Sequence, residues 1–218
     1  MRLYTVEAFD IPEAWFKCLA LVLDEGREYT VEKGSYEGTK RKELDYITIH
    51  IQNPGMRPLI PVIPPGMPVE PPTNLSYVYD YFENYLMSPV VAENETYTYG
   101  SRIHVSLFEV IEMLKKSPDT NQAIIQVGSP TDIFLEDPPC LRHIDCRLQG
   151  GRLHFIIYFR SWDLWGGFPT NLAGLQLLKE FMAEEIGCAD GEMICSSKGL
   201  HLYEYAWPVA KIRTYKYN

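Results

Sequence analysis

The sequence lacks long hydrophobic runs. Proline, glycine or charged residues interrupt each apolar stretch well before the roughly 18 residues that a membrane-spanning helix needs. The first residues, Met1 to Glu7, have neither the apolar segment of a signal peptide nor the composition of a transit peptide. We therefore expect a cytoplasmic protein without a membrane-spanning segment.

Cysteine is scarce, and its spacing excludes two classes of protein. The five cysteines form an odd set without a Cys-x-x-Cys pair, which fits neither a disulfide framework nor a zinc ribbon. We therefore expect no bound metal, and one cysteine could instead be a reactive thiol. The five are Cys18, Cys140, Cys146, Cys188 and Cys195.

Basic residues are fewer than acidic ones. There are 20 Lys and Arg against 29 Asp and Glu, a net charge of −9 with neutral histidines. This balance disfavours a general surface for nucleic acid or anionic membranes, because both partners are negatively charged. Any anion that the protein binds must therefore meet a local basic pocket.

What is present fits a globular enzyme. At roughly 150 residues per domain, the 218 residues predict one domain over 1–218. Apolar residues make up 46% and charged residues 22%, which excludes global disorder. The 28 aromatic residues (15 Tyr, 9 Phe, 4 Trp) and 16 prolines are typical of a mixed α and β core. We predict the α+β class.

Hydrophobic periodicity predicts four helices. The last is the most apolar and should pack against the sheet on several sides, with Thr170 or Asn171 as its N-cap and Gly187 after its end. The third should open at a capping box formed by Ser106 and Glu109. The predicted helices are Ile11–Asp24 with Asp10 as N-cap, Leu75–Leu86, Ser106–Lys116 and Asn171–Ile186.

Strands are predicted between these helices. Two of them should form an antiparallel hairpin around the turn Gln149-Gly150-Gly151. The charged run Glu32–Arg41 is interpreted as a solvated loop. The predicted strands are Tyr46–Ile51, Ala123–Val127, Cys140–Leu148, Arg152–Phe159, Glu192–Ser196 and His201–Val209.

Residues suited to a chemical site gather between Cys140 and Tyr203. Cys140 follows two prolines that fix the backbone, which suits a pre-positioned nucleophile, although a small buried cysteine is the simpler alternative. Arg160 follows an apolar strand, where an arginine usually binds an anion or a carboxylate. His201 and Tyr203 share one face of a strand by its period of two.

Four motifs together resemble, in order and spacing, the active-site signature of the thymidylate synthase family. They are Pro138-Pro139-Cys140, Arg160-Ser161-x-Asp163, Gly167-x-Pro169-x-Asn171 and His201-x-Tyr203. The resemblance covers roughly residues 94 to 205, beginning with Tyr99-Gly100, and is most like the short archaeal-type branch. It implies a large mixed, mostly antiparallel sheet packed by several helices, including a buried central helix.

The resemblance implies methylation of C5 of deoxyuridine monophosphate (dUMP), which makes dTMP. The implied nucleophile is Cys140, whose thiolate would add to C6 and so activate C5. Arg160 would lower the pKa of this thiol and bind the phosphate together with Ser161. The acidic residue that handles protons would be Asp80, with Glu83 as its competitor, and Tyr99 is a further catalytic candidate.

The remaining motif residues would bind the nucleotide. Asn171 offers a donor and an acceptor to the uracil edge, whereas a carboxylate there would suit cytosine. Asp163 would support the site near the base, and Gly167 would let the backbone lie close to it. His201 and Tyr203 would hydrogen-bond the ribose 3′ hydroxyl.

The sequence departs from the family at the phosphate and donor sites. The pair of arginines that the family sends across its homodimer falls at Asn121-Gln122, so a monomer is possible and Arg142, Arg102 or Arg41 could replace the charge. The usual tryptophans are absent from Val90–Thr98, and residues 211–218 replace the peptide that closes over folate. We therefore expect a methylene-tetrahydromethanopterin-like donor, with methylene-tetrahydrofolate as the other possibility.

Several alternatives stay open from the sequence. The same residues fit a hydroxymethylase acting on dCMP or dUMP, and a nucleotide-binding regulator without catalysis belongs to a different class. Cys146 shares a face with Cys140 on a regular strand and is the second candidate nucleophile. A metal site formed by Cys140, His143 and Cys146 is a remote possibility because the spacing matches no known ligand pattern.

Overall fold

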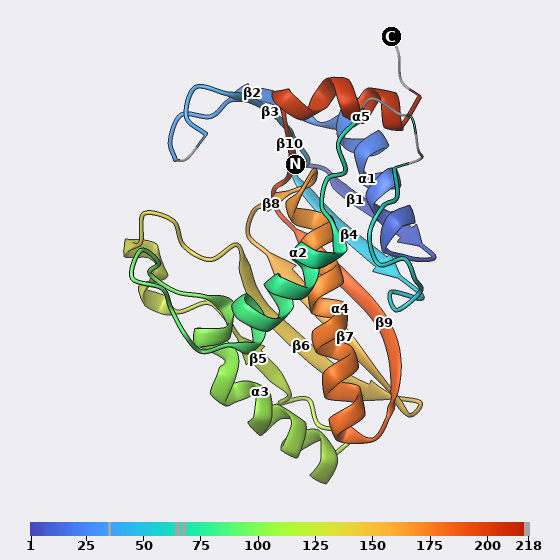
Figure 1. Cartoon of the computed structure of the whole chain (residues 1–218), viewed down its shortest axis with the longest axis vertical. Coiled ribbons are helices and arrows are strands. Elements are labelled where there is room, and N and C mark those ends of the chain that lie inside the picture. The colour runs from blue at the N-terminus through green and yellow to red at the C-terminus, as the bar shows by residue number, and fades with distance from the viewer. Residues whose placement is uncertain (35, 64–65, 67–68, 216–218) are drawn as a thin grey trace.

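The computed structural model describes residues 1–34, 36–63, 66 and 69–215 (Figure 1). Helices and strands alternate along the chain without a regular repeat. Their bounds, with η for 3-10 and π helices, are β1 (Leu3–Ala8), α1 (Ile11–Glu25), β2 (Arg27–Thr30), β3 (Lys40–Glu43), β4 (Tyr46–Ile51), α2 (Leu75–Asp80), η1 (Tyr81–Met87), α3 (Tyr99–Lys116), β5 (Ile124–Gln126), η2 (Pro130–Phe134), β6 (Leu141–Gln149), β7 (Arg152–Phe159), β8 (Trp162–Asp163), α4 (Gly167–Ile186), β9 (Ala189–Ser197), β10 (Leu200–Tyr203), η3 (Glu204–Ala206) and α5 (Trp207–Arg213).

The strands form two mixed sheets instead of one. The larger has the order β1-β4-β9-β7-β6-β5, and the smaller has the order β2-β3-β10-β8. Five of the eight strand pairs are antiparallel, and β1–β4, β7–β9 and β8–β10 are parallel. The predicted hairpin is β6–β7, closed by Gly150 and Gly151 with positive φ. The α+β class and the mostly antiparallel pairing are therefore confirmed.

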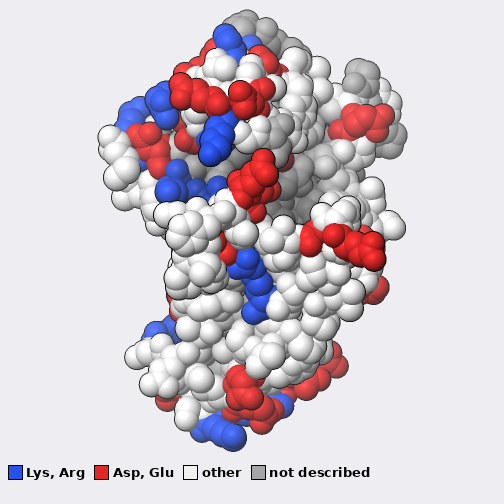
Figure 2. All heavy atoms as spheres, turned by 90° about the vertical axis from the view of Figure 1, so that its left-hand side faces the viewer, with Lys and Arg blue, Asp and Glu red and all other residues white. Residues whose placement is uncertain are grey.

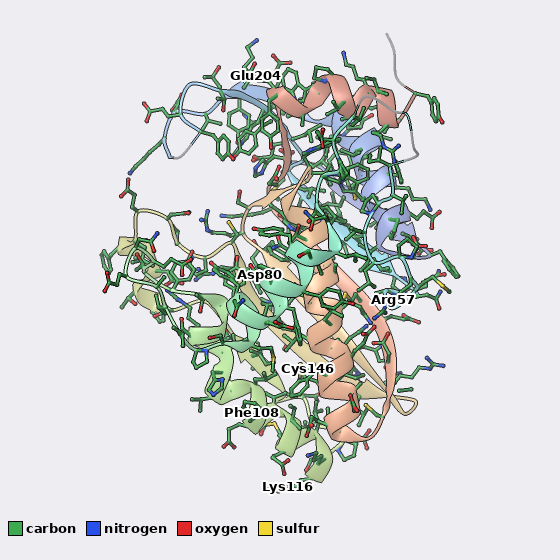
Figure 3. All side chains as sticks on the ribbon, in the orientation of Figure 1. Arg57, Asp80, Phe108, Lys116, Cys146 and Glu204 are labelled. Carbon is green, nitrogen blue, oxygen red and sulfur yellow. The ribbon has the colours of Figure 1, made fainter. Side chains whose placement is uncertain are left out.

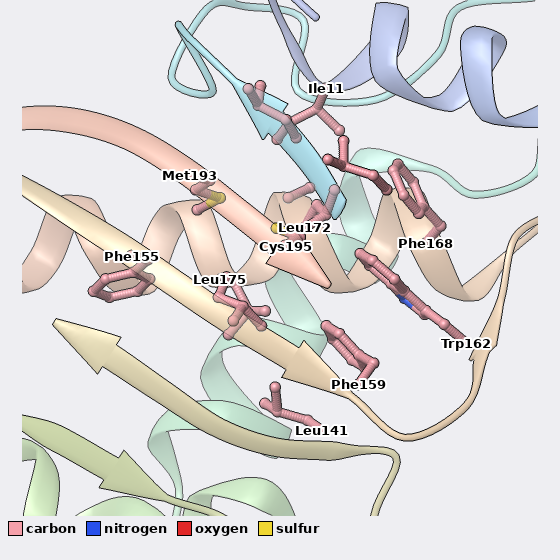
Figure 4. Close-up of a cluster of buried hydrophobic side chains, with 14 of the residues drawn as sticks. Ile11, Leu141, Phe155, Phe159, Trp162, Phe168, Leu172, Leu175, Met193 and Cys195 are labelled. Atoms are coloured by element: carbon pink, nitrogen blue, oxygen red, sulfur yellow. The ribbon is translucent and has the colours of Figure 1, made fainter. Parts of the chain in front are cut away.

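The central helix α4 packs against the larger sheet, as predicted (Figure 1). Leu172 and Leu175 of α4 lie among inward-facing side chains of β7 and β9, such as Phe155 and Met193, whereas Phe168 packs at the start of the helix against β8 (Figure 4). All five side chains are fully buried. At roughly 2 kcal/mol per buried large apolar side chain, this contact fixes the start of α4 firmly against the sheet.

The predicted first residues of two helices are wrong. Helix α3 begins at Tyr99, not Ser106, because Thr98 and Ser101 form the capping box that satisfies its first N–H groups. Helix α4 begins at Gly167, so Thr170 and Asn171 lie inside its first turns and do not cap it. Its predicted C-terminal Gly187 is confirmed, with φ of 81°.

The N-terminal helix agrees with prediction, whereas the charged segment after it does not. The Asp10 side chain accepts a hydrogen bond from the Glu13 backbone N–H and caps α1. The run Glu32–Arg41 was expected to be a solvated loop, but its last residues belong to β3. Strand β3 pairs with β2 and β10, and these long-range partners are invisible in the local charge pattern.

The C-terminal region also differs from prediction. Strand β10 ends at Tyr203, and residues up to Arg213 form η3 and α5 instead of continuing the strand to Val209. Pro208 lies in the first turn of α5, a position that proline favours in helices and not in central strands. The expectation for residues 211–218 falls partly outside the described residues, since 216–218 lie beyond them. In the described part of the chain, no helix has the length and apolarity to cross a membrane.

Candidate functional site

Most of the sequence-predicted residues lie around one cavity of about 280 Å³, which we call the thiol cavity. It opens between the β2–β3 hairpin, the segment before β6, and β10, and basic side chains gather around a hollow on this side of the molecule (Figure 2). Cys140, Arg160, Ser161, Asp163, His201 and Tyr203 all line it. The other lining residues are Val31, Lys33, Tyr36, Arg41 and Asp137.

Cys140 and Arg160 lie at the ends of neighbouring strands. Arg160 donates a backbone hydrogen bond of 2.8 Å to the Cys140 carbonyl, and its side-chain Nε lies 3.2 Å from the carbonyl oxygens of Pro138 and Pro139. Burial raises the pKa of the Cys140 thiol, and the nearby Arg160 guanidinium only partly offsets this effect. The thiol is therefore mostly protonated in the free protein at neutral pH.

Tyr99 and Cys146 have different relations to this thiol. The Tyr99 hydroxyl accepts a hydrogen bond of 3.3 Å from the backbone N–H of Leu141 and so holds the residue next to Cys140. Cys146 is buried in the core (Figure 3), and a register shift between Leu141 and His143 breaks the alternation that the sequence argument assumed. Cys146 is therefore not a nucleophile of this cavity, which corrects that alternative.

Only one of the three arginines proposed as replacements for phosphate charge lines the thiol cavity. Arg102 and Arg142 both pair with the buried carboxylate of Asp132, at 2.7 and 2.8 Å. Arg41 does line the cavity, and its guanidinium pairs with Glu43 at 2.8 Å. The structure thus places Arg41 and Arg160 together, from strands that are far apart in the sequence.

His201 has one ring nitrogen available in the cavity. Its Nδ1 lies 2.9 Å from the Gly199 carbonyl oxygen, so Nδ1 carries the hydrogen and Nε2 is the acceptor. In the part of the chain that the structure describes, this buried Nε2 has no hydrogen-bond partner. Burial lowers the pKa of His201 to about 4, which keeps the ring neutral. The Tyr203 ring contacts His201 edge-on, at 4.8 Å between ring centroids.

A second cavity of about 400 Å³ is lined by four tyrosines together with Asp80 and Asn171, and we call it the tyrosine cavity. The tyrosines are Tyr77, Tyr81, Tyr85 and Tyr99. Of the two carboxylates that the sequence left open, Asp80 lines the cavity and its Oδ1 accepts a hydrogen bond of 2.8 Å from Asn84. Glu83 is not among the described residues that line this cavity.

Asn171 is held at both ends of its amide. Its Oδ1 accepts a hydrogen bond of 3.1 Å from the Trp162 indole, and its Nδ2 donates one of 3.1 Å to the Tyr81 hydroxyl. A carboxamide has two N–H groups and two oxygen lone pairs, so one donor and one acceptor stay available. This pairing also fixes which end of the amide is oxygen.

Gly167 lies close to one lining residue of each cavity, Asp163 of the thiol cavity and Asn171 of the tyrosine cavity. Both oxygens of Asp163 accept backbone hydrogen bonds, from Trp165 at 3.2 Å and from Gly166 and Gly167 at 3.1 and 3.0 Å. Asp163 thereby fixes the loop that leads into α4. A methyl group added at Gly167 would lie 3.6 Å from Asn171 Oδ1, an ordinary contact, so packing does not require glycine there.

Sequence reasoning missed several lining residues. Lys33, Tyr36 and Asp137 come from loops whose sequence carries no site signal. The spacing of Tyr77, Tyr81 and Tyr85, four residues apart, does indicate one face of a helical segment, which was not used. Their convergence with α4 is a tertiary contact that no local pattern gives.

A larger cavity elsewhere has no cysteine in its described lining, and the described residues form no metal-binding group. A cavity of about 610 Å³ at the far end of α4 is lined by charged groups already paired with each other, such as Arg57 with Glu180 at 2.5 Å. Across the described ranges, no three His, Cys, Asp or Glu side chains form a group that could hold a metal ion. The alternative site of Cys140, His143 and Cys146 therefore does not form.

Comparison with known proteins agrees with this arrangement. The family model described as thymidylate synthase matches residues 79–214, which extends on both sides of the region recognised in the sequence. Proteins named "Putative thymidylate synthase" are 29% identical in Methanosarcina mazei and 28% in Methanosarcina barkeri, each covering 94% of this chain and 92% of the relative. One of the same name from Methanothermobacter marburgensis is 27% identical, covering 95% and 96%. These archaeal relatives agree with the branch that the sequence resembles, and the chain belongs to the thymidylate synthase family.

Proposed function

We propose that the protein is a thymidylate synthase that methylates dUMP at C5 through a covalent bond to Cys140. The observation that carries the proposal is the thiol cavity, in which a cysteine, two arginines and a neutral histidine face one space, while Asn171 lines the tyrosine cavity. A binding protein has no need of the thiol among these groups.

The phosphate would bind to Arg160, Ser161 and Arg41. Ser161 follows the end of β7, so the strand alternation that would point Arg160 and Ser161 in opposite directions no longer applies. A guanidinium binds phosphate oxygens through two parallel hydrogen bonds. Two such groups give the cavity positive charge even though the whole chain carries −9.

The sugar and base would be recognised by groups that still have free hydrogen-bonding capacity. His201 Nε2 would accept a hydrogen bond from the 3′ hydroxyl, since its lone pair is buried and unpaired among the described residues. The free N–H of Asn171 would donate to uracil O4, and its free lone pair would accept N3–H. Cytosine presents the opposite pattern at these two positions, so the site favours uracil.

The reaction would begin when Cys140 loses its proton to solvent; the thiolate then forms a bond to C6, and electron density moves through C5 to O4. C5 then attacks the one-carbon donor, which supplies a methylene group and a hydride. Asp80, at the tyrosine cavity, would hold or relay the proton that leaves C5. Tyr99 would keep the Cys140 backbone in place through its bond to Leu141. Release of the product breaks the bond between sulfur and C6.

The donor would be a reduced pterin bound in the tyrosine cavity, and we propose a methanopterin-type pterin over tetrahydrofolate. Support comes from the stacked rings of Tyr81 and Tyr85, 5.4 Å apart, which offer flat apolar surfaces to a pterin ring. The only ionic group in the described lining is Asp80, so this cavity suits a pterin ring and not the anionic tail that both donors carry. The choice of a methanopterin-type donor rests on the absence of the family's usual tryptophans from Val90–Thr98. Methylene-tetrahydrofolate supporting full turnover at ordinary affinity would contradict this choice of donor.

We also propose a homodimer that pairs the uncovered face of the larger sheet with a second copy. Outward-facing residues of β4, β7 and β9 lie there, and Ile156 and Ile194 are 38% and 37% exposed. Two apolar β-branched side chains on adjacent strands form a surface that a second sheet can cover. Light scattering after size exclusion should give twice the monomer mass, and Ile194→Glu should give the monomer.

The decisive experiment is incubation with 5-fluoro-dUMP and each candidate pterin, followed by intact mass spectrometry. We expect a covalent adduct with the wild type that requires the pterin, no adduct with Cys140→Ala, and an unchanged adduct with Cys146→Ala as the matched control. With dUMP itself, the product should have the mass of dTMP. A hydroxymethylated product, or tritium release from C5-labelled dUMP by Cys140→Ala, would refute the proposal.

A further inference from the structure

A carboxylate lies beside the cation that is expected to bind phosphate. Asp137 Oδ1 is 3.4 Å from Arg160 Nη2, and both side chains line the thiol cavity. The Asp137 side chain is 80% exposed and Arg160 is 30% exposed. Asp137 is therefore at the solvent side of this pair.

The position of Asp137 is fixed by its backbone. The Tyr97 hydroxyl donates a hydrogen bond of 3.1 Å to the Asp137 carbonyl oxygen, and Arg160 binds the carbonyls of the next two residues. The carboxylate is thus attached to an anchored segment, although its own side chain is exposed.

The charges in the thiol cavity are nearly balanced. Its cations are Lys33, Arg41 and Arg160, and its anions are Asp137 and Asp163. Arg41 is further neutralised by Glu43, which lies outside the lining. The lining therefore carries only a small net positive charge, so the cavity can accept a small number of negative charges.

We infer that Asp137 is a specificity-determining residue that limits the number of phosphate groups, so that nucleoside monophosphates bind in preference to di- and triphosphates. This inference rests on the proposed function. A first phosphate can share Arg160 with the carboxylate, whereas further phosphates would extend past Arg160 toward the exposed side of the pair. Like charges about 6 Å apart in water repel each other enough to weaken binding about threefold per charge.

The same carboxylate acts on the thiol. Asp137 raises the pKa of Cys140, opposite in sign to Arg160, although burial is the larger cause of the raised pKa. Replacing Asp137 by a neutral residue should therefore lower the pKa of Cys140. This gives a second readout that does not depend on any nucleotide.

The test compares Asp137→Asn with Glu136→Gln, a matched control that removes the same charge from the adjacent, exposed residue outside the described lining. Dissociation constants for dUMP, dUDP and dUTP are measured from the protection of Cys140 against iodoacetamide. The wild type should bind dUMP more tightly than dUTP. In Asp137→Asn the ratio of the dUTP constant to the dUMP constant should fall about tenfold, corresponding to two added charges, and high salt should diminish the difference.

Four outcomes decide between these possibilities. An unchanged ratio in Asp137→Asn, or an equal fall in Glu136→Gln, would overturn the specificity role while leaving the proposed function intact. If deoxyuridine nucleotides give no protection, the proposed function fails, and the same protection series with phosphate, pyrophosphate and tripolyphosphate still tests the charge limit. No protection by any of these anions would overturn both. A tenfold fall in the ratio in Asp137→Asn but not in Glu136→Gln, with a lower alkylation pKa of Cys140 in the same variant, supports the inference.

Discussion

Changing Asn171 to Asp should exchange the base preference of the site. The substitution keeps the size of the side chain and replaces an N–H donor by an acceptor. Oδ1 can still accept the Trp162 indole hydrogen, and the Tyr81 hydroxyl can rotate to donate to the new oxygen. We therefore expect the fold around α4 to survive and the effect to appear in nucleotide binding and turnover.

The magnitude follows from the two hydrogen bonds that change. With dUMP, the carboxylate faces uracil O4, so one acceptor loses its donor, which costs about 2 kcal/mol. With dCMP, the cytosine amino group donates to a carboxylate, a charge-assisted bond that contributes about 2 kcal/mol. The preference for dUMP over dCMP should change by about 4 kcal/mol, or roughly a thousandfold in the ratio of kcat/KM.

The assay measures tritium release from C5-labelled dUMP and dCMP, with the proposed pterin present, for the wild type and for Asn171→Asp. Asn53→Asp makes the same chemical change at an exposed residue near the far end of α4 and serves as the control. Equal preference in the wild type and Asn171→Asp would remove Asn171 from base recognition. A loss of stability comparable to the loss of activity would instead identify the amide as structural.

Three further predictions test the environment of the site. The alkylation rate of Cys140 should still be rising with pH above about 8.5, because burial raises the pKa of the thiol, and a plateau near pH 7 would contradict this. The pKa of His201 is lowered to about 4, so the unfolded chain binds a proton at this residue before the folded protein does as pH falls. Urea unfolding should therefore show that the free energy of unfolding decreases by up to about 3 kcal/mol between roughly pH 6.5 and 4. The decrease should be smaller in His201→Gln. Gly174→Ala would place a methyl group 2.5 Å from the Tyr81 ring and should cost about 2 kcal/mol of stability by calorimetry, whereas Gly167→Ala should cost little and weaken only nucleotide binding.

Residues whose roles are set by nearby sequence were predictable. The helix at Ile11 was placed to within one residue, because Asp10 caps it and its apolar residues repeat at helical spacing. The hairpin at Gly150 and Gly151 follows from two apolar strands joined by residues that tolerate positive φ. The order of the site motifs was also sufficient to identify the family, since it combines several unrelated residue types at fixed spacings.

Helix starts were less predictable, for a physical reason. Two capping boxes were possible for α3, and the structure uses Thr98 with Ser101 instead of Ser106 with Glu109. Each box would satisfy the first N–H groups of a helix that begins at its own position, so the choice depends on packing: Tyr99 is buried against the segment that holds Cys140. A short stretch of sequence does not reveal that contact, because the partner of Tyr99 is about 40 residues away along the chain.

The sequence by itself determined which chemistry the chain carries: a thiol after two prolines, an arginine at a strand end, a carboxamide and a histidine. Only the tertiary structure decided which basic group joins them, since Arg41 reaches the cavity through the pairing of β3 with β10, while Arg102 and Arg142 pair with Asp132. It also decided that Asn171 keeps one free donor and one free acceptor, because Trp162 and Tyr81 occupy the others. Composition and spacing give residue types, whereas free hydrogen-bonding capacity and charge pairing depend on distances across the fold.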